Sequence, residues 1–168
     1  HARAKITKVD ISKASKTSGV VKILTGDDLV KDKIGGLIAG WKIVSHDGKD
    51  MKCPPHPPLA KDVVNFVGDH VAVVIAETLE QAKNAAEQVS VGYKIQKAVI
   101  NAADATSFEN IHEGIDNNLC FDFLLGDKGK TDEAFSKADK VVKLDLVNNR
   151  LIPNAMEPRA AIGDYNPS

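Results

Sequence analysis

The stretch that decides the fold is VAVVIAETLEQ, residues 71–81. Residues 71–76 are six consecutive apolar residues, mostly β-branched, which is typical of a strand covered on both faces. Thr78 and Gln81 have the spacing of a capping box, in which each side chain bonds the other residue's backbone N–H, so a helix is predicted to begin here. Residues 89–95 are predicted to return as a strand. The sequence therefore predicts a strand–helix–strand unit as the core of the domain.

The predicted helix has a narrow apolar face. Its apolar residues on that face are Leu79, Ala82, Ala85, Ala86 and Val89. Because most of them are alanine, this face implies a close approach of the helix to the sheet.

Two strands are predicted before this unit. Residues 2–11 have imperfectly alternating apolar positions, and residues 20–24 are mostly β-branched. A Thr-Gly pair closes the second strand, and Asp27 or Asp28 is expected to cap a short helical turn there.

Further elements are predicted after residue 118. Residues 119–125 are expected to form a strand. The hydroxyl and acids of residues 131–133 are expected to begin a helix, with Phe135 and Ala138 on its inner face. Residues 142–146 alternate apolar and charged side chains, which predicts a half-buried strand.

Residues 31–61 are rich in glycine and proline and are predicted to form a long loop. Loops of this length are uncommon inside compact domains and are often functional or bound to a partner. Trp41, the chain's only tryptophan, lies in this loop. We expect Trp41 to anchor the loop on its own domain. The alternative is that it docks a neighbouring domain or subunit, since aromatic residues are enriched at interfaces.

The composition is that of an ordinary globular protein of one domain, or of one domain and the beginning of another. The chain has 168 residues, 43% of them hydrophobic and 27% charged, and a net charge of −1. Its lysines are dispersed, which argues against the concentrated basic face of a nucleic-acid-binding protein. There is no secretory leader pattern and no apolar run of about 18 residues, so no membrane span is predicted and a cytoplasmic location is expected.

Patterns for metal binding and catalysis are weak. Cys53 and His56 have a metal-ligand spacing and His46 is near, but no second pair completes a tetrahedral set. Cys53 is interpreted as an exposed thiol and Cys120 as a small core residue, and these two distant cysteines allow at most one disulfide. No nucleophile elbow or phosphate loop is present. We therefore predict no catalytic, cofactor-binding or metal-binding residue in this chain.

Two of the chain's three arginines lie in RLIPNAMEPRAA, residues 150–161. Its prolines lack a backbone N–H, which suits a strand boundary. If residues 154–162 form a strand, Glu157 and Arg159 share a face. We expect this pair to tie the segment to further parts of the protein; the alternative is a direct catalytic role. A last strand is expected at residues 160–165, and its unpaired apolar edge favours self-association, including a homodimer.

Four segments together resemble one family of enzymes. They are HARAKI (residues 1–6), HPPLA with FVGDHVAVVIAET (residues 56–60 and 66–78), GD with AF and ADKVV (within residues 126–142), and residues 150–165. In this order they resemble the large subunits of molybdenum hydroxylases, the family of xanthine dehydrogenase, aldehyde oxidase and carbon monoxide dehydrogenase. Within this family, the chain is similar to the carbon monoxide dehydrogenase-like branch. The family usually has proline where His70 stands, so His70 is expected to be an exposed turn histidine.

The resemblance implies an α+β fold, the α/β hammerhead domain, with a mixed sheet and two packed helices, followed by the first strands of a molybdenum-cofactor-binding domain. Residues 1–105 would form the hammerhead core. Residues 106–147 would supply its remaining strand–helix–strand and the connection, and residues 148–168 the start of a truncated molybdopterin-binding domain. The family's cofactor loops and catalytic glutamate lie beyond the matched segments, so we expect an excised domain that is inactive alone.

The resemblance also implies a function for the parent protein. This is oxidation of an aldehyde, an N-heterocycle or a CO-like small molecule with water-derived oxygen at molybdopterin, in its cytosine dinucleotide form. Electrons would pass to 2Fe-2S clusters and FAD on a small iron–sulfur subunit and a medium FAD subunit. The domain itself would serve inter-domain and subunit packing. A second hypothesis stays open: a non-catalytic, self-standing interaction module that uses loop 31–61.

Overall fold

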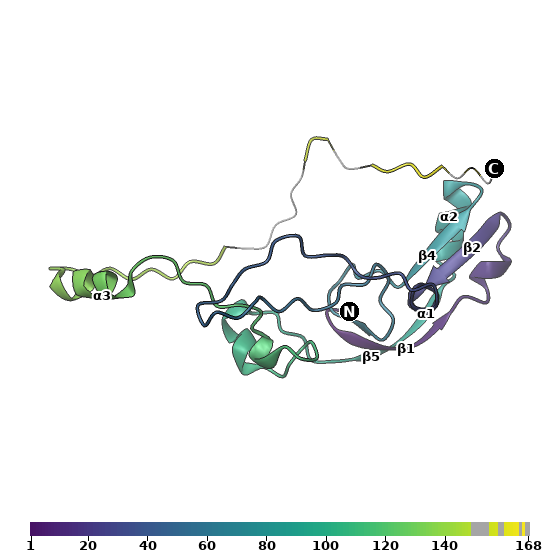
Figure 1. The fold of residues 1–168 in the computed structure, drawn as a ribbon. Helices are drawn as coiled ribbons and strands as arrows, with labels where there is room; N and C mark the ends of the chain where they lie inside the picture. Colours follow the sequence, from purple (N-terminus) through teal and green to yellow (C-terminus); the bar gives the residue numbers. More distant parts are fainter. Residues whose placement is uncertain (149–154, 158–159, 165, 167–168) are drawn as a thin grey trace. The chain divides into compact units, whose positions relative to one another are not determined.

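The protein divides into two compact units, His1–Leu125 and Gly126–Ser168, in a computed structural model (Figure 1). The structure describes residues 1–148, 155–157, 160–164 and 166. Within these residues the strands all belong to the first unit, where they form two small antiparallel sheets.

The first sheet has three strands in the order β3-β1-β5. The central strand is β1 (Ala4–Asp10), which pairs antiparallel with β3 (Val63–Val64). On its other side β1 pairs antiparallel with β5 (Ser90–Ile95) (Figure 1). The predicted strands at residues 2–11 and 89–95 are thereby confirmed. This sheet joins the N-terminal residues to two segments that lie far along the chain.

The pairing of β1 with β5 is interrupted by an irregularity at Thr7. The register shifts between Ile6 and Lys8, and Lys8 lies opposite Gly92. A Cβ atom on Gly92 would lie 2.6 Å from Thr7 Oγ1. Glycine therefore lets the two strands stay in contact where one of them bulges.

The second sheet pairs β2 (Val20–Thr25) antiparallel with β4 (Ala72–Ala76). Helix α2 (Leu79–Ala86) follows β4 and packs against it. The strand predicted at residues 20–24 and the strand predicted at residues 71–76 are both confirmed to within a residue or two.

The capping box that was predicted for α2 is present. Thr78 Oγ1 accepts a hydrogen bond from the backbone N–H of Gln81 at 3.2 Å, and Gln81 Oε1 accepts one from the backbone N–H of Thr78 at 3.0 Å. On the packed face Ala85 is fully buried, but Leu79 is 72% exposed. The helix therefore contacts the sheet through a narrower alanine face than the sequence predicted, because Leu79 in the first turn stays in solvent.

The prediction of one mixed sheet is wrong. β4 and β5 flank α2 along the chain but belong to different sheets, and the pairings of both sheets are antiparallel. The expectation that β4 is covered on both faces is also wrong, since Val73 and Ile75 are each 44% exposed. One helix packs on this sheet, so successive residues of β4 alternate between partly buried and exposed.

The buried core lies on the three-stranded sheet. Ala4, Ile6, Ala60 and Val64 form its centre, and Val9, Val71 and Val91 pack against them. Ala60 is held in place by a 2.6 Å hydrogen bond from its backbone N–H to the carbonyl of His70. The segments HPPLA and FVGDHV thus meet at this core, although the chain makes a turn between them.

Helix α1 (Gly26–Lys31) confirms the short helix predicted after β2, but its cap is a different residue. Thr25 is the N-cap, and Asp28 accepts hydrogen bonds from Thr25 N at 2.8 Å and Thr25 Oγ1 at 2.9 Å. The backbone bond first, and then the hydroxyl bond, lower the pKa of Asp28. Asp28 is therefore the third helical residue of a capping box, and the cap lies two residues before Asp27, the earlier of the two expected positions.

Residues 32–61 are irregular, as predicted, but they contain one ordered turn. Val44 bridges Asp50, and Ser45 N donates to the carbonyl of Lys49 at 2.8 Å around Gly48, whose φ is +80°. The expectation that Trp41 anchors the loop on its own domain is wrong, because Trp41 is 83% exposed.

Residues 119–125 were predicted to be a strand and are not one. They run beside the long loop: His46 N donates to the carbonyl of Asp122 at 2.8 Å, and Lys52 N donates to that of Cys120 at 2.9 Å. Two isolated bonds do not make a ladder, so the segment has no regular strand pairing.

In the second unit, helix α3 (Lys128–Lys137) is capped by Asp127, whose side chain accepts from Lys130 N at 3.0 Å. The helix therefore begins three residues before the position predicted from residues 131–133. Phe135 is 60% exposed rather than on an inner face, and α3 has no buried residue. Residues 142–146 and 160–164 form no strand, because a strand needs a pairing partner and none is present among the described residues. Tyr165 lies outside the described residues.

Candidate functional site

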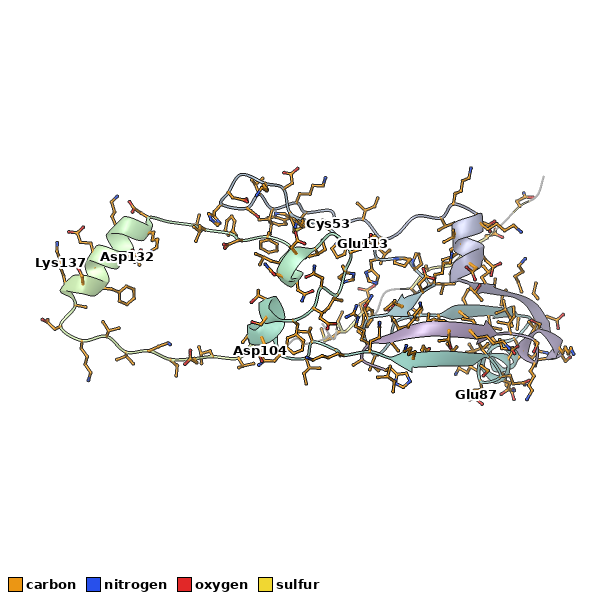
Figure 2. All side chains as sticks on the ribbon, turned by 90° about the horizontal axis from the view of Figure 1, so that it is seen from below. Cys53, Glu87, Asp104, Glu113, Asp132 and Lys137 are labelled. Atoms are coloured by element: carbon orange, nitrogen blue, oxygen red, sulfur yellow. The ribbon has the colours of Figure 1, made fainter. Side chains whose placement is uncertain are left out.

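The structure does not assemble the candidate metal ligands. His46 Nδ1 lies 3.3 Å from Asp122 Oδ2, and the ring of His56 contacts Phe66 edge to face. Cys53 lies on the long loop (Figure 2), where its Sγ is 3.8 Å from the carbonyl of Met51. Across residues 1–148 and the shorter described segments, no three His, Cys, Asp or Glu side chains are grouped to hold a metal ion.

Both cysteines are free thiols. Cys53 is exposed, as predicted, whereas Cys120 is only partly buried and is not a core residue. The reason is that Cys120 lies on the irregular segment beside the loop, outside both sheets, where no layer covers it.

Four further polar residues were singled out by sequence. His70 is exposed, as expected for a turn histidine. Glu157 is exposed, while Arg150 and Arg159 lie outside the described residues. The interaction between Glu157 and Arg159 therefore stays a prediction.

The long loop carries an exposed apolar surface. We call it the loop surface; its exposed members are Ile34, Leu37, Ile38, Trp41 and Val44. Ile38 is 93% and Trp41 83% exposed. Large apolar side chains gathered in one exposed segment mark an interaction site more often than singly scattered ones do. The loop surface therefore leaves five large apolar side chains in contact with solvent.

Sequence reasoning missed the third arginine, Arg3. Its guanidinium is partly buried, and Nη2 donates to the carbonyl of Ile111 at 3.0 Å. The neighbouring His112 has a pKa below its ordinary value of 6.5, first because of burial and second because of the positive charge of Arg3. The signal available in the sequence was the rarity of arginine in this lysine-rich chain, at position 3 as at positions 150 and 159. The burial of Arg3 is seen only in the structure.

Comparison with known proteins identifies the family of this domain. Residues 1–97 match the family model described as "Aldehyde oxidase and xanthine dehydrogenase, a/b hammerhead domain". The chain is 32% identical over 147 residues to xanthine dehydrogenase/oxidase of Rattus norvegicus, covering 87% of this chain and 9% of that protein. It is 29% identical over 172 residues to the 6-hydroxypseudooxynicotine dehydrogenase complex subunit gamma of Paenarthrobacter nicotinovorans, covering 100% of this chain and 21% of that protein.

Solved structures agree. CO dehydrogenase from Oligotropha carboxidovorans superposes with a TM-score of 0.62 at 26% identity, covering 83% of this chain and 18% of that chain. Quinoline 2-oxidoreductase from Pseudomonas putida 86 superposes with a TM-score of 0.57 at 29% identity, covering 65% and 13%. The sequence thus spans between about a tenth and a fifth of the length of these relatives.

Two small antiparallel sheets with few helices define an α+β domain of the hammerhead class. The chain belongs to the aldehyde oxidase and xanthine dehydrogenase family, the large subunits of molybdenum hydroxylases. Its homologues are molybdenum-dependent oxidoreductases. No helix among the described residues is both long enough and apolar enough to cross a membrane.

Proposed function

We propose that this chain is part of the large subunit of a molybdenum-dependent hydroxylase, and that its role there is to pack against other domains and subunits. The observation that carries the packing role is the loop surface. Burying a large apolar side chain stabilises an assembly by about 1.5–3 kcal/mol, and Ile38 and Trp41 are left almost wholly exposed. A neighbouring domain or subunit that covers them would supply that stabilisation.

The described residues do not fit a metal centre, because no group of three metal-ligating side chains occurs among them. In this proposal no described residue is assigned to molybdopterin or to an iron–sulfur cluster, and none takes part in a reaction step. Molybdopterin, when bound elsewhere in such a protein, supplies the oxidation of the substrate with water-derived oxygen. In this proposal a medium partner subunit binds FAD and a small partner subunit binds the 2Fe-2S clusters. The proposed location of the complex is the cytoplasm.

The organisation that we propose keeps the expected boundaries. Residues 1–105 are the hammerhead core, residues 106–147 are its extension and connection, and residues 148–168 begin the molybdopterin-binding domain. The family match over residues 1–97 supports the first of these boundaries.

The proposed substrate class is a small N-heterocycle or aldehyde, with a CO-like molecule as the third option. Support comes from the names of relatives, which refer to xanthine, nicotine and quinoline. These relatives share the hammerhead fold, and fold alone does not determine substrate. Activity assays with a purine, a pyridine, an aldehyde and CO on the native enzyme would separate the options.

The deciding experiment is the mass and molybdenum content of the native polypeptide that contains this sequence. We expect a far larger chain with molybdenum, purified together with flavin and iron–sulfur subunits. A native chain of about 18.0 kDa that contains no molybdenum would refute the proposal.

The exposure of Trp41 also favours the second candidate, a self-standing interaction module. That module predicts a saturable partner contact that is lost in Trp41→Ala, in a native chain free of molybdenum. Both candidates predict that Trp41 is covered by a partner, so the metal content, not the contact, distinguishes them.

A further inference from the structure

A pocket of about 180 Å³ lies at one end of the three-stranded sheet. Its walls are formed by residues 2–3 at the start of β1, residues 65–67 after β3, residues 98–100 after β5, and Ile111. All of these residues belong to the first unit. We call this the Arg3 pocket, and it is separate from the loop surface, which lies on residues 34–44.

Two polar atoms of the lining residues are buried without a partner among the residues the structure describes. They are Arg3 Nε and Asn65 Oδ1. The rest of each residue is held in place: Arg3 Nη2 donates to the Ile111 carbonyl at 3.0 Å, and Asn65 N donates to Asp69 Oδ2 at 2.9 Å. A buried donor and a buried acceptor without partners cost free energy, and native proteins rarely leave such atoms unsatisfied.

The pocket also has an unneutralised charge. Within the described part of the chain no carboxylate lies within ion-pair distance of the Arg3 guanidinium. A partly buried cation of this kind attracts an anion, and arginine is suited to a carboxylate because the geometry of its donors matches that group.

The rim of the pocket is apolar. Val67 is 79% exposed and Ile100 is 90% exposed. A small hydrophilic acid would leave these side chains in water, whereas a protein segment with apolar residues would cover them. The unpaired Asn65 Oδ1 favours the same kind of occupant, because this oxygen needs an N–H donor and a simple carboxylate has none.

We propose that the Arg3 pocket receives an acidic side chain, Asp or Glu, carried by an otherwise apolar protein segment. The carboxylate accepts from Arg3 Nε–H, a backbone N–H of the segment donates to Asn65 Oδ1, and apolar neighbours of the acid cover Val67 and Ile100. The inference rests on the proposed packing role and adds a second docking site of defined chemistry.

The test uses the native protein with its subunits, purified after Val67 is replaced by the photo-cross-linking residue p-benzoylphenylalanine. The matched control carries the same residue at Val21, which is 68% exposed on β2. We expect Val67 to capture one peptide that contains Asp or Glu among apolar residues. Arg3→Gln should lower that yield about tenfold, the loss expected when a charge-assisted hydrogen bond is removed.

Three controls make the result specific. Arg3→Lys keeps the charge without Nε–H and should give an intermediate yield. Asn65→Ala should also weaken capture, and it serves as the second variant should Arg3→Gln fail to give the wild-type circular dichroism spectrum. Changing the captured acid to its amide should give the same loss as Arg3→Gln, with no further loss in the double variant.

Several outcomes would overturn the inference. They are a yield at Val67 no higher than at Val21, a captured peptide without a carboxylate, or capture that Arg3→Gln and Asn65→Ala leave unchanged. Stabilisation by sodium acetate that depends on Arg3, without peptide capture, would instead assign the pocket to a small carboxylate. A molybdenum-containing protein that fails this test refutes the Arg3 pocket alone, whereas a native chain without molybdenum refutes the proposed function.

Discussion

Gly26→Ala is predicted to destabilise the first unit, although alanine is the better helix former. Gly26 is buried at the start of α1. A Cβ atom there would lie 2.8 Å from the carbonyl oxygen of Ala60 and 2.8 Å from Lys61 Cα, where ordinary contacts begin at 3.4 Å. Both contacts are with backbone or Cα atoms, so no flexible side chain can move aside. The helix and the end of the long loop must separate.

The magnitude follows from two opposing effects. Forcing an extra methyl group into a packed site costs about 1–3 kcal/mol. The change from glycine to alanine in a helix stabilises the helix by at most about 1 kcal/mol. The net expectation is a loss of about 1–2 kcal/mol, which lowers the ratio of folded to unfolded protein by roughly tenfold.

The measurement is urea denaturation followed by far-ultraviolet circular dichroism, since Trp41 is exposed and its fluorescence reports poorly on burial. Gly129→Ala is the matched control: this glycine is also in a helix, and its Cβ would meet only Asp127 Oδ1, at 3.4 Å. The control should leave the midpoint of the first unit unchanged. A rise in the midpoint for Gly26→Ala would show that helix propensity outweighs the contact with Ala60 and Lys61, and the reasoning would be wrong.

Three further predictions address the cap, a histidine and the loop surface. Thr78→Ala should lower the free energy of unfolding by about 1 kcal/mol, because the bond from Gln81 N to Thr78 Oγ1 is lost; Thr78→Ser should retain most of it in the same urea assay. The lowered pKa of His112 means that the unfolded state binds a proton first, so stability should fall as pH drops below about 6.5. His112→Gln should flatten that slope, and an unchanged slope would contradict the assignment. Trp41→Ala should change the unfolding free energy by no more than about 0.5 kcal/mol, because the side chain is 83% exposed; a loss of several kcal/mol would mean that Trp41 packs on its own domain.

The local elements were predictable because their signals lie within a few residues of one another. The capping box of Thr78 and Gln81, the β-branched run of β4 and the strands β1, β2 and β5 all follow from spacing and residue type. The family resemblance was predictable for the same reason, since it rests on short motifs in a fixed order.

The candidate site was less predictable. Trp41, Cys120 and Phe135 have apolar neighbours in sequence, and each was expected to be covered. Their exposure depends on what packs on them, and no local pattern records that. Arg3 shows the converse: it donates to the carbonyl of Ile111 and shares a pocket with Asn65, and both of these residues are remote from it in sequence.

Residue order by itself determined where the main strands and α2 form, because backbone propensity, capping and side-chain periodicity are local. Only the tertiary structure decided that β4 pairs with β2 while β5 pairs with β1, which turns one predicted mixed sheet into two antiparallel ones. It also decided which apolar faces stay in solvent and that Arg3 lines a pocket. The physical reason is that strand pairing and burial are set by contacts between distant segments, whose free energy no local stretch of sequence contains.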